Sequence, residues 1–305
     1  MATLEGLDPA QSPLSAVISF HLLTNQTDLM EKILVPIDFS DHSENALNYA
    51  VAIAQRFDYE IVLFHTTPLP VGAVDLAQTP VDMNWQADID KASKERLQEW
   101  VVSAKQKADK ELHFSVRTSM GDLIPSIKIY VEEEDVELIV TSTRGADGAL
   151  IEWMGTNSSD LVAETQIPIL VVPEKATFRG FKEILYATNF EVGDQSNLRD
   201  TMAFAKAFDA KVDVVHVDVD DERPENDVEL FENDVRPFEA PKTVRFWQVK
   251  AKEIENGINK LAKDNNSDLI AIVRPMRGFW DELFHQSISK KLALHSERPL
   301  LVLRP

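Results

Sequence analysis

The chain contains one sequence pattern twice, and this duplication restricts the folds that it can adopt. Four segments recur, displaced by 151 residues early in each copy and by 131 residues later in each copy. The pairs are 32–39 with 183–190, 61–65 with 212–216, 137–140 with 268–271, and 167–173 with 298–304. The smaller offset shows that the second copy is shorter in its middle. We therefore expect two domains of one architecture.

The composition agrees with two domains. A chain of 305 residues is long enough for two hydrophobic cores, and 44% hydrophobic with 27% charged residues is typical of a soluble globular protein. The formal net charge of −20 argues against nucleic acid or an anionic membrane as the main partner. A mononucleotide is not excluded, because a few backbone amides can bind phosphate locally. The absence of cysteine excludes disulfides and thiol chemistry and agrees with a cytoplasmic location.

We divide the chain into a leader, residues 1–29, and two domains, residues 30–175 and 180–305. The leader contains no Lys or Arg and lacks a convincing signal-peptide cleavage site, so we interpret it as disordered or non-native. No stretch approaches the roughly 20 apolar residues of a membrane span.

Within each copy, short apolar runs alternate with helical periodicity. In the first copy we expect strands at 33–37, 60–65, 112–117, 136–142 and 168–172, and helices from a cap near Ser43 to Phe57 and at 88–109, 124–134 and 158–166. In the second copy we expect strands at 183–188, 211–217, 243–249, 268–273 and 299–303, and helices at 196–209, 250–264 and 287–296. Residues 218–241 are interpreted mostly as loop. This alternation predicts an α/β fold with a parallel sheet and helices on both faces.

Polar residues and glycines of the first copy gather where strands end. Asp38 closes the first strand, Thr66 follows the second, and Gly121 separates the third strand from its helix. In an open α/β sheet, ligands bind beyond these carboxyl ends. The Asp38 carboxylate can accept hydrogen bonds from a ribose or an adenine amine, and the Thr66 backbone can pair with a base edge. The alternatives are a helix N-terminal acid for Asp38 and a simple turn for Gly121.

A second group surrounds the predicted start of the helix at 158–166. Glycines let the backbone approach phosphate oxygens, and a helix start supplies unpaired amides. Hydroxyl groups add donors to the same region, and the guanidinium of Arg144 either reaches the same anion or is a solvated surface group. The residues are Ser142, Arg144, Gly145, Gly155, Thr156, Asn157 and Ser158.

These residues carry a resemblance to a tandem universal stress protein that covers about residues 30–305. Nucleotide-binding members of that family have an Asp closing the first strand and the pattern Gly-x-x-Gly, nine residues, then Gly-Ser/Thr. Asp38, Gly145, Gly155 and Thr156 match, whereas Ser142 stands where the family has its first glycine. The resemblance implies two tandem Rossmann-like (adenine nucleotide alpha hydrolase-like) domains, each with a five-stranded parallel sheet, that pair through their last strands. It also implies that the first domain binds ATP or AMP, with Mg²⁺ as an optional companion, through the residues above together with Ile37.

The second copy lacks most of this set. Asn189 replaces Asp38, and the glycine and serine positions of the phosphate loop are occupied by Val273, Met276 and Gln286. We expect no ATP there. His65 and His216 recur at strand ends, and we interpret both as structural, hydrogen-bonded histidines rather than catalytic or metal-binding ones.

The sequence predicts a nucleotide-responsive stress or signalling module without efficient catalysis. No residue is predicted to be catalytic, because no Gly-x-x-x-x-Gly-Lys-Ser/Thr loop or acidic metal cage is present. A slow ATPase and a pure interaction or scaffold protein remain alternatives, and a homodimer is left open.

Overall fold

The computed structural model describes residues 30–68, 83–143, 161–188, 194–219, 244–273 and 298–304. In the first half the elements are β1 (Lys32–Pro36), α1 (Asp41–Phe57), β2 (Glu60–Thr67), α2 (Met83–Lys107), β3 (Phe114–Met120), α3 (Leu123–Glu133), β4 (Val136–Ser142) and β5 (Ile169–Val172). In the second half they are β6 (Glu183–Ala187), α5 (Asp194–Ala207), β7 (Lys211–Asp218), β8 (Val244–Lys250), α7 (Ile254–Asp264), β9 (Leu269–Val273) and β10 (Leu300–Leu303). The predicted leader, residues 218–241 for the most part, and the predicted helix at 287–296 lie outside the described residues.

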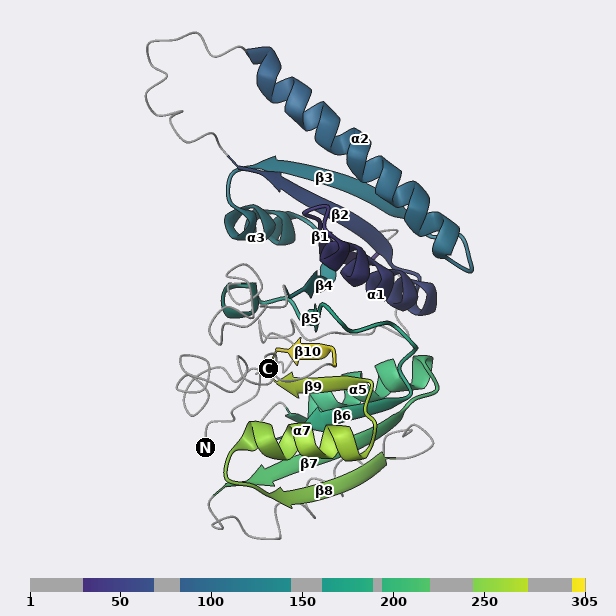
Figure 1. Cartoon of the computed structure of the whole chain (residues 1–305), viewed down its shortest axis with the longest axis vertical. Coiled ribbons are helices and arrows are strands. Elements are labelled where there is room, and N and C mark those ends of the chain that lie inside the picture. The colour runs from purple at the N-terminus through teal and green to yellow at the C-terminus, as the bar shows by residue number, and fades with distance from the viewer. Residues whose placement is uncertain are drawn as a thin grey trace, which may run out of the picture.

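All ten strands form one continuous sheet in the order β3-β2-β1-β4-β5-β10-β9-β6-β7-β8 (Figure 1). Each half contributes five parallel strands, and β5 pairs antiparallel with β10, so the two halves meet through their last strands. The strand registers repeat as the sequence does: Ile33 pairs with Ile61, and Ile184 pairs with Val212. The predicted α/β fold and the pairing of the halves are confirmed.

The strands have apolar residues on both faces because helices cover both. Along β1, Ile33 and Val35 face the core beneath α1, α2 and α5, whereas Leu34 faces the core beneath α3 and α7. Alternate residues of a strand point to opposite faces, so a continuous apolar run is the pattern that a doubly covered strand requires. In Figure 1, α1 and α2 accordingly lie on the opposite side of the sheet from α3.

Several predicted element boundaries differ by a few residues. Helix α2 begins at Met83 and not at residue 88, β2 ends at Thr67 and not at residue 65, and α5 covers Asp194–Ala207 and not 196–209. Three further differences have a clear cause. Helix α1 is capped by Ser40 and not near Ser43, because Ser40 is extended and its hydroxyl accepts a hydrogen bond from the Ser43 amide, 3.3 Å away. Strand β3 begins and ends later than predicted because it pairs with β2 as far as Thr67. Helix α7 begins at Ile254, because β8 continues to Lys250.

A buried carboxylate fixes the outer strand of the second half. The carboxylate of Asp213 on β7 accepts hydrogen bonds from Arg245 Nε at 2.6 Å and Nη2 at 2.8 Å, from Trp247 Nε1 at 3.0 Å and from Asn265 Nδ2 at 2.7 Å. The hydrogen bond to Asp213 raises the pKa of Arg245. Burying a carboxylate is tolerated because these donors replace its water. This network joins β7, β8 and the end of α7.

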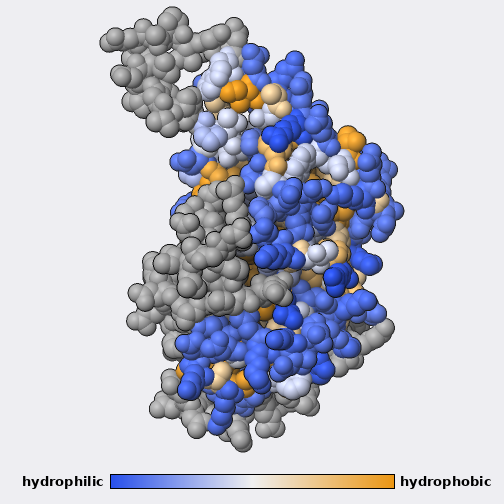
Figure 2. All heavy atoms as spheres, viewed as in Figure 1, coloured by the Kyte–Doolittle hydropathy of each residue, from blue (hydrophilic) through white to orange (hydrophobic). Residues whose placement is uncertain are grey.

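The visible surface is mostly hydrophilic, with small, separate hydrophobic areas (Figure 2). In the part of the chain that the structure describes, no helix is long and apolar enough to cross a membrane.

Candidate functional site

The carboxyl ends of β1 to β4 form one edge of the first half. Ile37 directly follows β1, and its amide donates to the Phe64 carbonyl of β2 at 2.7 Å. Thr66 lies inside β2, one residue before its end, and does not follow the strand as predicted, because β2 continues to Thr67. Gly121 follows β3, and Ser142 ends β4. Asp38 follows Ile37, so the described members of the predicted site share this edge.

Asp38 is held by the turn that follows it. The Oδ1 atom of Asp38 accepts hydrogen bonds from the Ser40 amide at 3.0 Å and from the Ser40 hydroxyl at 2.5 Å. Because Ser40 also caps α1, Asp38 belongs to the capping network at the start of that helix. The side chain nevertheless stays exposed, so water or a ligand can reach it.

The residue after Asp38 adopts an unusual backbone conformation. Phe39 has a φ of 63°, in the left-handed region that side chains rarely occupy. Its ring lies 4.6 Å from the ring of His65 and 5.8 Å from that of Trp100, and the Arg96 guanidinium carbon lies 4.0 Å from its centre. Sequence reasoning missed Phe39, Arg96 and Trp100. The one available signal was the spacing of Arg96 and Trp100, which places them on one face of a helix.

Gly121 occupies a turn that requires glycine for its conformation. Its φ is 107°, and an added Cβ would meet no atom within 4 Å, so conformation and not space selects glycine here. Its amide donates to the Thr67 carbonyl at 2.9 Å and closes the end of β3 against β2.

The phosphate-loop residues of the prediction lie outside the described residues. They are Arg144, Gly145, Gly155, Thr156, Asn157 and Ser158. On either side of them, β4 ends at Ser142 and residues 161–164 are helical, with Leu161 and Val162 buried in the core.

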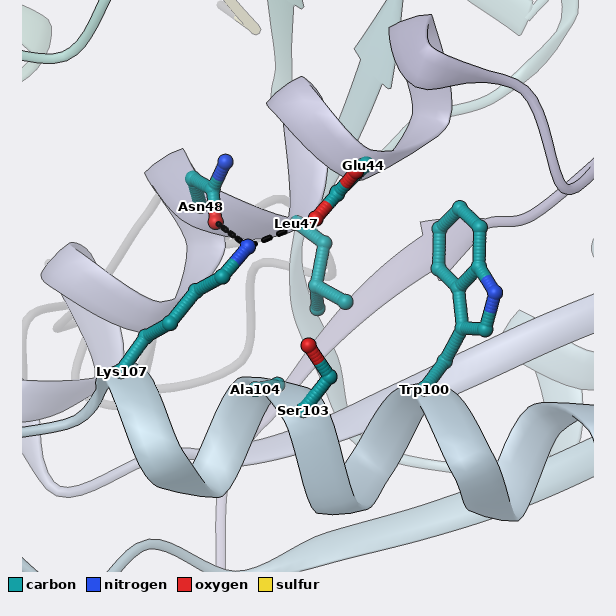
Figure 3. A pocket seen from close by; sticks show the side chains of 7 residues that line it. All are labelled: Glu44, Leu47, Asn48, Trp100, Ser103, Ala104 and Lys107. Atoms are coloured by element: carbon teal, nitrogen blue, oxygen red, sulfur yellow. Dashed lines mark hydrogen bonds and ion pairs between the residues drawn. The ribbon is translucent and has the colours of Figure 1, made fainter.

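A small pocket lies between α1 and α2, next to this edge (Figure 3). Trp100 lines one end of it, and Lys107 lies at the other, where its ammonium donates to Glu44 at 2.6 Å and to Asn48 at 3.4 Å. The pocket has a volume of about 120 Å³. Sites for drug-sized ligands have about 300–1,000 Å³, so this pocket is too small for a nucleotide.

At the start of α5 in the second half, buried polar side chains bond to one another. Asp194 is buried, and Tyr186 donates to its carbonyl at 3.0 Å and to its Oδ1 at 3.2 Å, while the Thr188 hydroxyl donates to its Oδ2. Burial raises the pKa of Tyr186 well above its usual value. The first half has Val35, Ile37 and Ser43 at these positions, so this network belongs to the second half alone.

The two recurring histidines have the same partner type in both halves. His65 Nδ1 lies 2.7 Å from the Ile37 carbonyl, and His216 Nδ1 lies 3.0 Å from the Thr188 carbonyl. These hydrogen bonds agree with the predicted hydrogen-bonded role, because each ring connects the end of one strand to the neighbouring strand. Among the described residues, no group of three or more His, Asp or Glu side chains is placed to hold a metal ion.

Comparison with known proteins matches this repeated architecture. The model of the universal stress protein family matches residues 30–173 and again residues 180–304. The chain belongs to the universal stress protein family. It contains two tandem universal stress protein regions, which correspond to the two halves of the sheet.

Individual relatives agree with this assignment. A universal stress protein of Methanocaldococcus jannaschii is 28% identical over 153 residues, which cover 50% of this chain and 86% of the relative. One from Bacillus subtilis is 28% identical over 152 residues, which cover 47% of this chain and 99% of the relative. These relatives therefore match one half at a time.

A solved structure matches the whole tandem arrangement. The crystal structure of a universal stress protein from Archaeoglobus fulgidus superimposes with a TM-score of 0.69 at 17% identity, and the match covers 90% of this chain and 96% of the other. At this identity the likeness supports the fold alone.

Proposed function

We propose that this universal stress protein binds an adenine nucleotide, ATP or AMP, at the carboxyl edge of its first half and acts as a stress-response or signalling module without efficient catalysis. The observation that carries the proposal is the position of Asp38. Its carboxylate is exposed at the end of the central strand β1, and the Ser40 amide and hydroxyl fix its orientation. A fixed, accessible acceptor at this place suits a sugar hydroxyl.

Each residue of the proposed site has a distinct part. The Asp38 carboxylate accepts from the ribose, and the backbone at Thr66 pairs with the base edge. Ile37 borders the base, because its amide already donates to the Phe64 carbonyl. Gly145, Gly155, Thr156, Asn157 and Ser158 supply amides and hydroxyls for the phosphates, Arg144 adds a positive charge, and the backbone at Gly121 and Ser142 borders the ligand. Mg²⁺, when bound with ATP, would neutralise phosphate charge.

In the proposal, the second half binds no nucleotide. Val273 ends β9 where Ser142 ends β4, and Asn189 stands at the position of Asp38. The buried contacts of Asp194 with Tyr186 and Thr188 are a further difference between the halves at the first helix start.

Isothermal titration calorimetry with ATP, ADP and AMP tests the proposal. We expect one site per chain, and we expect Asp38→Ala and Gly155→Glu each to abolish the heat of binding. Asn189→Ala and Gln286→Glu make the matched changes in the second half and should leave binding unchanged. No heat with any of these nucleotides at millimolar concentration, or heat that only the second-half variants remove, would refute the proposal.

The same samples separate the two remaining functions. Phosphate release from ATP well above background, lost in Thr156→Ala, would favour a slow ATPase. Purified protein that neither carries nor binds nucleotide would favour an interaction protein. For each of these functions we propose a cytoplasmic location, with which the lack of cysteine agrees. Sedimentation at several concentrations would then show whether the partner is a second copy.

A further inference from the structure

The contact between α2 and the β1–α1 turn has no part in the site described so far. Arg96 lies one helical turn before Trp100 on α2, and both side chains contact Phe39, which follows Asp38 directly. Two segments that are far apart in sequence thus meet beside the proposed ribose acceptor.

Phe39 needs this contact because of its backbone conformation. A left-handed φ is disfavoured for an aromatic residue and persists only where the surroundings hold it. Here His65 contacts one part of the ring, Trp100 meets it nearly edge-on with an interplanar angle of 82°, and the Arg96 guanidinium lies over it at 4.0 Å. At this distance the cation and the ring attract each other.

The conformation of Phe39 decides where Asp38 points. The backbone reverses at Phe39, which brings the Ser40 amide and hydroxyl onto the Asp38 carboxylate. If Phe39 relaxed to an ordinary φ, these two donors would move away and the carboxylate would lose its fixed orientation. Ligand binding would then have to order the carboxylate, and the affinity would be lower.

We propose that Arg96 is a positioning residue of the nucleotide site: its guanidinium holds Phe39 in the left-handed conformation and thereby fixes Asp38. This inference rests on the proposed nucleotide function. The two halves differ in the segment that carries Arg96. The second half keeps Phe190 after Asn189, but residues 219–243 connect β7 to β8, and this segment is shorter than residues 68–113, which connect β2 to β3.

Calorimetry on Arg96 variants tests the inference, with adenosine and ATP as the two probes. We expect Arg96→Ala to lower the affinity for both ligands by the same factor, about threefold to fivefold. This factor corresponds to the free energy of an exposed cation–π contact, and it applies to both ligands because Asp38 binds the ribose that they share. Arg96→Lys keeps a cation and should restore part of the affinity. Lys91→Ala removes an equally exposed charge from the same helix, away from Phe39, and should change neither affinity.

Each alternative role of Arg96 gives a different result. A direct phosphate contact would weaken ATP and leave adenosine unchanged, and a purely structural role would lower the melting temperature without changing either affinity. Either result would overturn the inference while leaving nucleotide binding intact. A wild-type protein that binds neither ligand would instead refute the proposed function itself.

Hydrogen exchange of the ligand-free protein supplies a readout independent of affinity. In Arg96→Ala the Ser40 amide, which donates to Asp38, should exchange faster than in the wild type, and Phe39→Ala should have the same effect because it removes the ring while its Cβ still disfavours the left-handed φ. Unchanged exchange at Ser40 in both variants would show that Arg96 and the Phe39 ring do not hold the turn.

Discussion

Asp200 in α5 occupies the position that Tyr49 holds in α1, yet it is an acid in a largely apolar setting. Its Oδ2 atom is buried and has no hydrogen-bond partner among the described residues. Burial raises the pKa of Asp200 to about 7, and the charge of Arg199 opposes this shift only in part. Keeping this carboxylate ionised therefore costs free energy in the folded protein.

The raised pKa predicts a dependence of stability on pH. Below about pH 4 Asp200 is protonated in both the folded and the unfolded states and costs nothing. As the pH rises to 7, the unfolded state loses its proton first, so stability falls over this interval and stays low above it. Asp200→Asn should therefore be more stable than the wild type at pH 8, by about 1–2 kcal/mol after allowance for solvent screening.

Urea unfolding at pH 4 and pH 8 measures this difference. The variant and the wild type should differ little at pH 4 and clearly at pH 8. Asp109→Asn, at an exposed position, serves as the control and should shift neither midpoint. An Asp200→Asn variant whose advantage is the same at both pH values would contradict the assigned cause.

At the scale of elements, the two halves hold their outer strands differently. In the first half Val62 pairs with Ser115 across β2 and β3, and in the second half Asp213 pairs with Arg245 across β7 and β8. The first pair is uncharged, so its two residues can be introduced in place of Asp213 and Arg245 to test the charged pair. Removing Asp213 would leave Arg245 with Glu183 alone, 3.4 Å away, as its acceptor among the described residues. It would also take the acceptor from Trp247 and Asn265, and these losses are destabilising.

We expect Asp213→Val to lower the free energy of unfolding by about 2 kcal/mol, reduced from the fully buried case because Arg245 is partly exposed. The double variant Asp213→Val/Arg245→Ser copies the first half and should recover a substantial part of that loss. Chemical denaturation of the three proteins measures both effects. A double variant that is less stable than Asp213→Val alone would mean that Arg245 stabilises β8 independently of the carboxylate.

The elements themselves were largely predictable from sequence, whereas the contacts between them were not. Strands such as β1 and β4 are short apolar runs that can be recognised in the sequence. The predicted ends of β1 to β4 placed Asp38, Thr66, Gly121 and Ser142 at one edge of a parallel sheet. The stacking of Arg96 on Phe39 escaped prediction because hydrophobic periodicity describes one segment at a time. Such contacts depend on the packing of α2 against the sheet, which no local pattern encodes.

At the scale of the whole molecule, side chains cross the seam between the halves. Phe57 of α1 stacks on Phe204 of α5 with ring centres 5.7 Å apart, and β5 pairs with β10. Arg304, which follows β10, is buried and reaches into the first half, where it donates to the Val162 carbonyl at 3.0 Å and the Ile167 carbonyl at 3.3 Å. The guanidinium thus donates to one carbonyl of the helix at 161–164 and to one just beyond its end, where carbonyls lack the full set of intrahelical donors.

This contact predicts that a substitution in the second half loosens the first. Arg304→Met keeps much of the volume but removes the guanidinium donor from those carbonyls, so hydrogen exchange at residues 161–167 should accelerate and stability should fall by about 1–3 kcal/mol. Arg298→Met is the matched control, because Arg298 donates to the Ser267 carbonyl of its own half at 2.6 Å and should affect only that neighbourhood. If exchange at residues 161–167 is the same in Arg304→Met as in the wild type, Arg304 does not hold that helix end.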